Sequence, residues 1–354
     1  MNESVRHFLR YTSWPIILAM IALITVGILS IRACEGAEGR DLGFARKQTV
    51  WACVALAVFV AAALMPYQVI GRWAYAIFGA TLVLLLALAA ARVVGHSSWL
   101  IPAKRGARRW INLGFALLQP SELAKLSFII MLAWYLRHGD HYRRLRGLAV
   151  PFVLTFIPLA MILYQPDLGT SLLLLPTLYF MLFMAGAKWR HLLGIVGLAT
   201  VLVFLPVPRP AEGVGSVGDD HEALAYGSLT WSGRRYLLLA APLAIMERHQ
   251  LHRIDGWLRQ GSDADEIAMG RGYQLRQSKT TLAAGMATGR GDWADADTYL
   301  ASLPDDHTDF VFSVVGGQWG FVGCVGTLLL YAVIFLFGIE IAVITYDPFG
   351  RLLA

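Results

Sequence analysis

The sequence predicts an all-α, polytopic membrane protein: a bundle of about eight transmembrane helices with one large extracytoplasmic loop. Of its 354 residues, 57% are hydrophobic and only 15% are charged, whereas a soluble domain is about 45–50% apolar and about 25% charged. The apolar residues gather into runs close to the roughly 20 residues that a spanning helix needs. These two observations exclude an ordinary soluble fold.

Polar or Gly/Pro-containing breaks separate the apolar runs, and each run predicts one span. The spans cover residues 14–33, 48–65, 69–91, 120–136, 148–164, 168–186, 190–207 and 310–345. The first run passes the length of a signal-peptide core without a small-residue cleavage site, so we interpret it as a retained span. A run at 236–246 is too short to span alone and is either the top of the seventh helix or an interfacial segment.

Arginine and lysine on short loops predict the orientation, because such residues mark the cytoplasmic side. They occur in the N-terminal residues, in the 137–147 loop and in the 187–191 turn, which places the N-terminus in the cytoplasm. The segments 34–47, 92–119 and 208–309 then lie outside. We treat residues 1–354 as a single membrane-embedded domain, in which 208–309 is the large loop and 209–235 a flexible insertion rich in Gly, Pro and acids.

Charge and cysteine content exclude other classes of function. The net charge of +6 is explained by topology signals on loops, so we do not expect nucleic-acid binding. Three cysteines, Cys34, Cys53 and Cys324, are scattered and show neither a metal-ligand spacing nor a disulfide framework. We expect them to be packing residues and predict no protein metal site.

A cationic segment at 104–110, Lys-Arg-Gly-Ala-Arg-Arg-Trp, lies on the predicted outer side, against the positive-inside bias. Arg108 and Arg109 next to Trp110 would suit an anionic headgroup such as a diphosphate, because charge-assisted hydrogen bonds to phosphate are strong. The alternative is that these side chains reach phospholipid phosphates and anchor a helix end. Both interpretations remain open from the residues alone.

Two further motifs lie at predicted helix starts. In Gln119-Pro-Ser-Glu-Leu-Ala-Lys125, Glu122 and Lys125 are three residues apart and share a helix face; they form either a structural ion pair or part of a wet cavity. In Gln165-Pro-Asp-Leu-Gly-Thr170, Asp167 opens a helix and suits an N-cap. A substrate-facing role for Asp167 is the alternative.

Two segments before the eighth span complete the candidate site. The stretch at 271–279, followed by Gly285, Gly289 and Gly291, is either a re-entrant hairpin in a water-lined cleft or a solvated surface helix. The stretch Leu303-Pro-Asp-Asp-His-Thr-Asp-Phe310 gathers acids and an imidazole where the chain re-enters the membrane. Asp309 adjoins the apolar run and is the costliest of these acids to bury, so it is the leading functional carboxylate; a helix cap is the alternative.

Together these motifs resemble the SEDS family (shape, elongation, division and sporulation), the RodA/FtsW type of peptidoglycan glycosyltransferase. The resemblance runs from the first span to Leu353 and rests on motifs at 106–110, 119–125, 165–170, 272–278 and 303–310. It implies the polymerisation of lipid II at the outer face of the bacterial cytoplasmic (inner) membrane. The resemblance also implies a class B penicillin-binding protein as partner, beside membrane lipids.

The resemblance assigns the catalytic role to Asp309, which would act as the general base on the attacking hydroxyl. The expected substrate-binding residues are Arg108, Arg109, Trp110, Glu122, Lys125, Asp167, Gln274, Gln277, Ser278, His307 and Thr308. Positive charge for the diphosphate leaving group would come from Arg108, Arg109, Lys125 or Arg276. The alternative source is a bound divalent cation, Mg²⁺ or Mn²⁺; no other cofactor is expected.

The sequence departs from the family pattern in three places. Gly316-Gly-Gln-Trp-Gly320 lacks an acidic pair that the family shows, the 209–235 insertion is unusual, and the chain stops at Ala354 without two last spans. We therefore expect a fragment of a ten-span protein. The rival functions are a lipid II flippase, whose ionisable residues would line a path, and a non-catalytic scaffold for the penicillin-binding protein.

Overall fold

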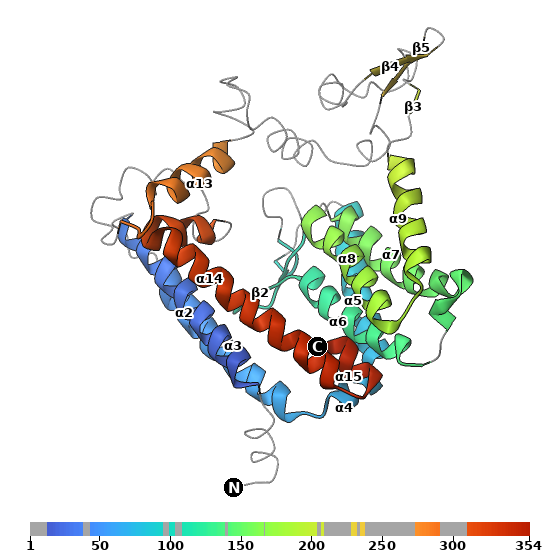
Figure 1. The fold of residues 1–354 in the computed structure, drawn as a ribbon, viewed down its shortest axis with the longest axis horizontal. Coiled ribbons are helices and arrows are strands. Elements are labelled where there is room, and N and C mark those ends of the chain that lie inside the picture. Colours follow the sequence, from blue (N-terminus) through green and yellow to red (C-terminus); the bar gives the residue numbers. More distant parts are fainter. Residues whose placement is uncertain are drawn as a thin grey trace. The chain divides into compact units, whose positions relative to one another are not determined.

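A computed structural model describes residues 13–37, 43–94, 99–102, 108–138, 141–165, 167–203, 207–208, 228–231, 234–237, 273–290 and 310–354. These residues form mainly α-helices (Figure 1). The chain divides into two compact units. The first unit comprises Met1–Met65 and His252–Ile341, and the second unit comprises Pro66–Leu251 and Ala342–Ala354.

The first unit contains four described helices, of which α14 extends a few residues beyond it: α2 (Trp14–Ala37), α3 (Phe44–Leu64), α13 (Tyr273–Ala284) and α14 (Val311–Ile344). Helix α2 packs against α3. The carboxylate of Glu35, near the end of α2, accepts hydrogen bonds from the backbone N–H groups of Phe44 and Ala45. It thereby satisfies two amides of the first turn of α3, which have no partner within the helix.

The second unit is a helical bundle with a small β-hairpin. Its elements are α4 (Tyr67–Arg72), α5 (Ala74–Val94), β1 (Ile111–Asn112), β2 (Leu117–Leu118), α6 (Pro120–Leu136), the 3₁₀ turns η1 (His141–Arg143) and η2 (Leu145–Leu148), α7 (Ala149–Tyr164), α8 (Leu168–Ala185), α9 (Trp189–Val203) and α15 (Pro348–Leu353). Helix α6 contacts α5, α7, α8 and α15. It is therefore the central helix of this bundle.

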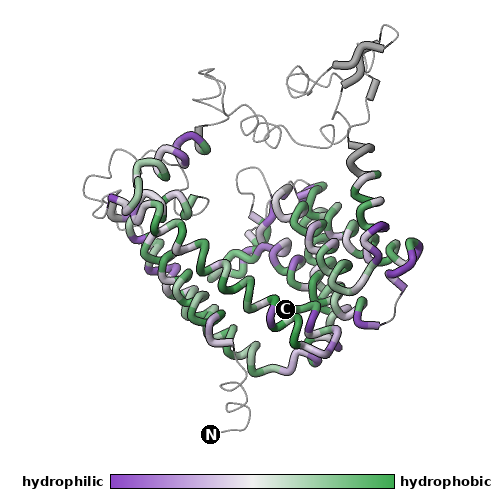
Figure 2. The backbone as a smooth tube through the Cα atoms, in the orientation of Figure 1, coloured by the Kyte–Doolittle hydropathy of each residue, from purple (hydrophilic) through white to green (hydrophobic). Residues whose placement is uncertain are grey.

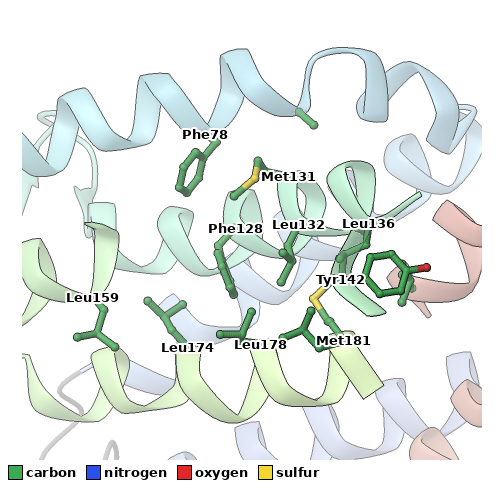
Figure 3. Packing of buried hydrophobic residues seen from close by; sticks show 14 of the residues in the cluster. Phe78, Phe128, Met131, Leu132, Leu136, Tyr142, Leu159, Leu174, Leu178 and Met181 are labelled. Atoms are coloured by element: carbon green, nitrogen blue, oxygen red, sulfur yellow. The ribbon is translucent and has the colours of Figure 1, made fainter. Parts of the chain in front are cut away.

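Apolar side chains of α6 form the core of the second unit. Phe128, Met131 and Leu132 are fully buried, and they lie between Phe78 of α5 and Leu178 of α8 (Figure 3). The hydroxyls of Thr81 and Ser127, which are buried in the same layer, lie 2.8 Å apart and satisfy each other. A packed, satisfied interface of this kind holds the ends of α5, α6 and α8 in fixed positions.

Hydrophobic residues dominate the helices along their length, and hydrophilic residues gather at helix ends (Figure 2). Five described stretches are long and apolar enough to cross a membrane: Trp14–Glu35, Phe44–Leu64, Ala74–Val93, Leu145–Tyr164 and Val311–Ile344. Gly169–Ala185 is a shorter apolar helix. The membrane class of the fold is confirmed, whereas the count of eight spans and the extracytoplasmic position of the large loop stay predictions.

Each predicted span coincides with a helix, with two differences. The span predicted at 69–91 is divided into α4 and α5 by a break at Trp73, and directly before the break Gly71 closely approaches the Trp134 and Phe349 rings. Short strands also occur where we expected none: β1 pairs with β2, and β3 (Val207–Pro208), β4 (Ser228–Trp231) and β5 (Arg234–Leu237) form an antiparallel sheet in the order β3-β5-β4. Residues 209–227 lie outside the described residues, so the flexible insertion stays a prediction.

Candidate functional site

Polar side chains gather at one end of the second unit, where five chain segments meet. These segments are the last turn of α5, the stretch from Arg108 into the β1–β2 hairpin, the start of α6, the end of α7 and the start of α8. The hairpin explains the meeting, since it carries the chain from Arg108 back to Gln119 directly before α6. We call this group of segments the polar end.

The carboxylate of Asp167 joins the start of α8 to the start of α6. Its Oδ2 accepts hydrogen bonds from Gln119 Nε2 at 3.0 Å and from Ser121 Oγ at 3.3 Å. Its Oδ1 accepts from the backbone N–H of Thr170 at 3.4 Å, which is the N-cap that the sequence predicts. We call Gln119, Ser121 and Asp167 the carboxylate clasp. The N-cap interpretation is thus confirmed, and a contact between Asp167 and substrate stays a prediction.

Two guanidinium groups bind the carbonyls at the end of α7. Arg109 Nε donates to the carbonyl oxygen of Gln165 at 2.8 Å, and Arg92 donates to that of Tyr164 while lying 5.0 Å from the centre of the Tyr164 ring. The last carbonyls of a helix lack partners within it and carry partial negative charge, so cations are stabilising there. The buried side chain of Gln165 in turn donates to the carbonyl of Leu85 at 3.2 Å.

The expected pair on α6 forms. Lys125 Nζ lies 2.8 Å from Glu122 Oε2, with 27% of the lysine side chain and 55% of the glutamate side chain exposed. An ion pair this accessible contributes only about 0–1 kcal/mol to stability. Glu122 directly follows Ser121 of the clasp, and Lys125 lies one turn further along α6.

Three predicted residues lie in the first unit. Gln277 and Ser278 are on α13, and Ser278 Oγ lies 2.5 Å from Ser313 Oγ in the first turn of α14. The backbone of Gln274 is in α13. The structure shows a helix over Tyr273–Ala284 that contacts α14 through Ser278, and both interpretations of the 271–279 stretch stay predictions.

Some predicted residues are outside the described part of the chain. His307, Thr308 and Asp309 belong to this group, and Phe310 is the first described residue after them. The catalytic role of Asp309 therefore stays a prediction. Within the described ranges, no group of three His, Cys, Asp or Glu residues could hold a metal ion, and the divalent-cation alternative is untested.

Three residues that hydrogen-bond to predicted site residues or their neighbours were not predicted from the sequence. Arg92 could have been noticed as a cation in the last turn of an apolar helix on the same predicted side as Arg109. Gln119 belongs to one of the predicted motifs, but nothing local showed that its amide reaches Asp167. Ser313 sits inside an apolar run, and no signal in the sequence distinguished it.

A comparison with models of protein families identifies the family of this chain. A model of the FtsW, RodA and SpoVE proteins, described as "Cell cycle protein", matches residues 10–210 and 225–354. The chain belongs to the FtsW/RodA/SpoVE family. The matched residues include every motif of the polar end, the α13 segment and the His307-Thr308-Asp309 stretch, and they leave out only residues 1–9 and 211–224.

Relatives within the family carry names that describe an enzyme. Peptidoglycan glycosyltransferase MrdB of Escherichia coli K12 is 29% identical over 338 residues, which cover 96% of this chain and 78% of MrdB. Peptidoglycan glycosyltransferase RodA of Treponema pallidum is 28% identical over 378 residues, which cover 96% of this chain and 84% of that protein. A probable peptidoglycan glycosyltransferase FtsW of Aliivibrio salmonicida is 30% identical over 328 residues, which cover 90% of this chain and 68% of that protein.

Solved structures show the same fold. A chain from a study of a "peptidoglycan synthase complex" that coordinates polymerization and crosslinking superposes with a TM-score of 0.68 at 24% identity, covering 96% of this chain and 81% of that chain. The rod shape determining protein RodA of Thermus thermophilus superposes with a TM-score of 0.55 at 23% identity, covering 97% of this chain and 80% of that chain. The FtsW/RodA/SpoVE fold is therefore present in this chain.

Proposed function

We propose that the chain is a peptidoglycan glycosyltransferase that polymerises lipid II at the outer face of the bacterial cytoplasmic membrane. Family membership and three relatives of that name support the activity. The observation in the structure that carries the proposal is the polar end. There, three of the five motif segments that the sequence marks as substrate-facing, at 106–110, 119–125 and 165–170, converge at one end of an apolar bundle; a reaction on a membrane-anchored substrate requires polar groups in such a place.

The reaction would proceed by one displacement. The sugar 4-hydroxyl of one lipid-linked disaccharide attacks the anomeric carbon of another, a C–O bond forms, and the bond to undecaprenyl diphosphate breaks. Asp309 accepts the proton of the attacking hydroxyl as the new bond forms. A single displacement without a covalent intermediate inverts the anomeric centre.

The departing diphosphate must be stabilised by positive charge. Arg109 and Lys125 supply it at the polar end, where both are held by the hydrogen bond or ion pair described above. Arg108 and Arg276 are further candidates, and a divalent cation is an alternative source. The carboxylate clasp would act on these groups indirectly, by fixing the start of α6 on which Lys125 stands.

We further propose that the protein works with a class B penicillin-binding protein. One structural relative comes from a peptidoglycan synthase complex that coordinates polymerization and crosslinking, and such a partner would crosslink the new polymer. The basic loops at 137–147 and 187–191 favour a cytoplasmic N-terminus. In that orientation the polar end faces outward, where the polymer is needed.

The decisive experiment supplies lipid II to the purified protein and its partner, with moenomycin present to suppress contaminating classical glycosyltransferases. Wild type is compared with Asp309→Ala and with the matched control Asp305→Ala, which removes an acid four residues earlier. We expect Asp309→Ala to make no detectable glycan and Asp305→Ala to stay close to wild type. Equal glycan from wild type and Asp309→Ala would show that Asp309 is not the catalytic residue.

The same preparation separates the rival functions. If no preparation makes glycan, but lipid II crosses the membrane of vesicles that contain the protein, the protein is a transporter. If neither activity is found and the penicillin-binding protein is stimulated, the chain is a scaffold.

A further inference from the structure

Helix α14 is interrupted at Gly320, inside an otherwise apolar helix. Gly320 has φ 64° and ψ −159°, a conformation that is open essentially to glycine alone. In an uninterrupted helix, the N–H groups of Phe321 and Val322 would donate to the carbonyls of Gly317 and Gln318. Such an interruption leaves polar backbone groups in an apolar environment, where each unsatisfied group is costly.

The turn that follows α13 satisfies this interruption. Phe321 N donates to Met286 O at 2.8 Å, and Val322 N donates to Ala287 O at 3.1 Å. In return, the carbonyl of Gly317 accepts from Arg290 N at 3.3 Å. Three backbone hydrogen bonds thus join the turn at 285–290 to the broken helix. The two segments are locked together by their main chains.

Glycines permit the approach that these hydrogen bonds need. A Cβ at Gly285 would overlap the carbonyl oxygen of Gly316, a Cβ at Gly289 would overlap that of Gln318, and a Cβ at Gly320 would overlap Gly289 N. We call Gly285, Gly289, Gly316, Gly317 and Gly320 the glycine joint. By contrast, a Cβ at Gly326, on the same helix, would meet no atom within 4 Å.

The joint has a consequence for the start of α14. Its first turn is held against α13 at a second point by the Ser278 and Ser313 hydroxyls, 2.5 Å apart. Ser313 stands four positions after Asp309 in the chain. The joint and this serine pair therefore fix the first turn of α14, which begins at Val311.

We propose that the glycine joint is a positioning device for catalysis: it holds against α13 the first turn of α14, which begins two residues after Asp309. This inference rests on the proposed function of Asp309. It also gives a role to the Gly316–Gly320 stretch, in which this sequence lacks the acidic pair of its family. The stretch contributes backbone groups to the joint.

Kinetics of single substitutions test the proposal. Gly320→Ala and Gly289→Ala should each lower kcat for lipid II polymerisation by at least about tenfold, because a shift of the order of 1 Å at a catalytic group costs up to about a hundredfold. KM should stay within about threefold, because neither Gly320 nor Gly289 is among the expected substrate-binding residues. Gly326→Ala, the matched control, should leave both constants at the wild-type values.

A crosslink reports the joint independently of catalysis. In a background without Cys34, Cys53 and Cys324, the pair Ser278→Cys and Ser313→Cys should form a disulfide under mild oxidation, because the two hydroxyls are nearly in contact. The pair Thr280→Cys and Ser313→Cys should not, since Thr280 lies about 200° further round the helix. Adding Gly320→Ala should lower the yield of the first crosslink, and adding Gly326→Ala should not.

Several outcomes would overturn the proposal. The first is a kcat of Gly320→Ala equal to that of Gly326→Ala. The second is a Gly320→Ala variant that loses the crosslink but polymerises lipid II at the wild-type rate. The third is a Gly320→Ala variant that loses kcat while the crosslink yield is unchanged. Should neither Gly320→Ala nor Gly289→Ala fold with the partner protein, Ser313→Ala, which adds no atoms, decides: a wild-type kcat contradicts the positioning role. An active Asp309→Ala overturns the proposed function and the positioning role together, while the crosslink still shows whether the joint forms.

Discussion

At the scale of single residues, the carboxylate clasp shows how one acid serves two helices. Asp167 caps α8 through Thr170 and accepts from Gln119 and Ser121, which lie 48 and 46 positions earlier. Ser121 and Thr170 are almost completely buried. Removing the acid would therefore leave buried donors without a partner, which costs more than a typical hydrogen bond contributes.

Asp167→Asn replaces one acceptor oxygen by an NH₂ donor, which must face either the donors of Gln119 and Ser121 or the N–H of Thr170. We expect a loss of about 1–3 kcal/mol in the free energy of unfolding, and for Asp167→Ala a further loss of about 0.5–2 kcal/mol from the cap. Thermal unfolding in detergent measures both. Glu340→Gln, at an exposed acid of α14, is the control and should change little.

A double-mutant cycle with Gln119→Ala separates the clasp from the cap. If Gln119 acts through Asp167, the combined loss for Gln119→Ala and Asp167→Ala is smaller than the sum of the single losses. Additive losses would show that the two side chains contribute independently.

At the scale of elements, α15 fastens the opposite end of the bundle. Phe349 is fully buried, with ring centres 5.1 Å from Trp134 and 5.9 Å from Tyr67. Asp347 caps α15 through Gly350 N at 3.2 Å. Burial, reinforced by the Asp347 carboxylate, raises the pKa of the Tyr67 phenol.

Two substitutions test this packing. Phe349→Ala should destabilise the second unit by about 3–5 kcal/mol, the usual cost of truncating a buried Phe. Gly71→Ala should also destabilise it, because the new Cβ would overlap the Trp134 ring, whereas Gly79→Ala meets no atom within 4 Å and is the matched control. The unfolding temperatures of the three variants measure these effects. Equal unfolding temperatures for Gly71→Ala and Gly79→Ala would contradict the close approach of α4 to Trp134.

At the scale of the whole molecule, the second unit has two chemically different ends. The polar end carries the clasp, Arg109 and the Glu122–Lys125 pair. The other end carries the exposed basic loops between α6 and α7 and between α8 and α9. Cationic loops favour the cytoplasmic side, so the orientation predicted from the sequence places the polar end outside.

Cysteine labelling tests this orientation in cells. In a background without native cysteines, Phe115→Cys, at the 82% exposed tip of the β1–β2 hairpin, should react with a membrane-impermeant thiol reagent in intact spheroplasts. Arg144→Cys should react only after the membrane is permeabilised. Labelling of Arg144→Cys in intact spheroplasts would reverse the orientation and place the polar end in the cytoplasm.

Much of the fold was predictable because its causes are local. Apolar runs of spanning length predict helices, and helices occupy most of each predicted span. Asp167 was predictable as a cap from its place before a helix. The break at Trp73 was not predicted, and the residues that α4 packs against there, Trp134 and Phe349, are distant in the chain.

The sequence by itself determined the membrane class, the helices, the family and the residues that make up its motifs, since hydrophobicity and motif spacing are properties of neighbouring residues. Only the tertiary structure decided which motif residues touch. It joined Gln119 to Asp167, directed Arg109 to the end of α7, and locked the turn after α13 into the break at Gly320. These contacts span tens of positions, and they exist because packed helices bring particular backbone and side-chain groups within hydrogen-bonding distance.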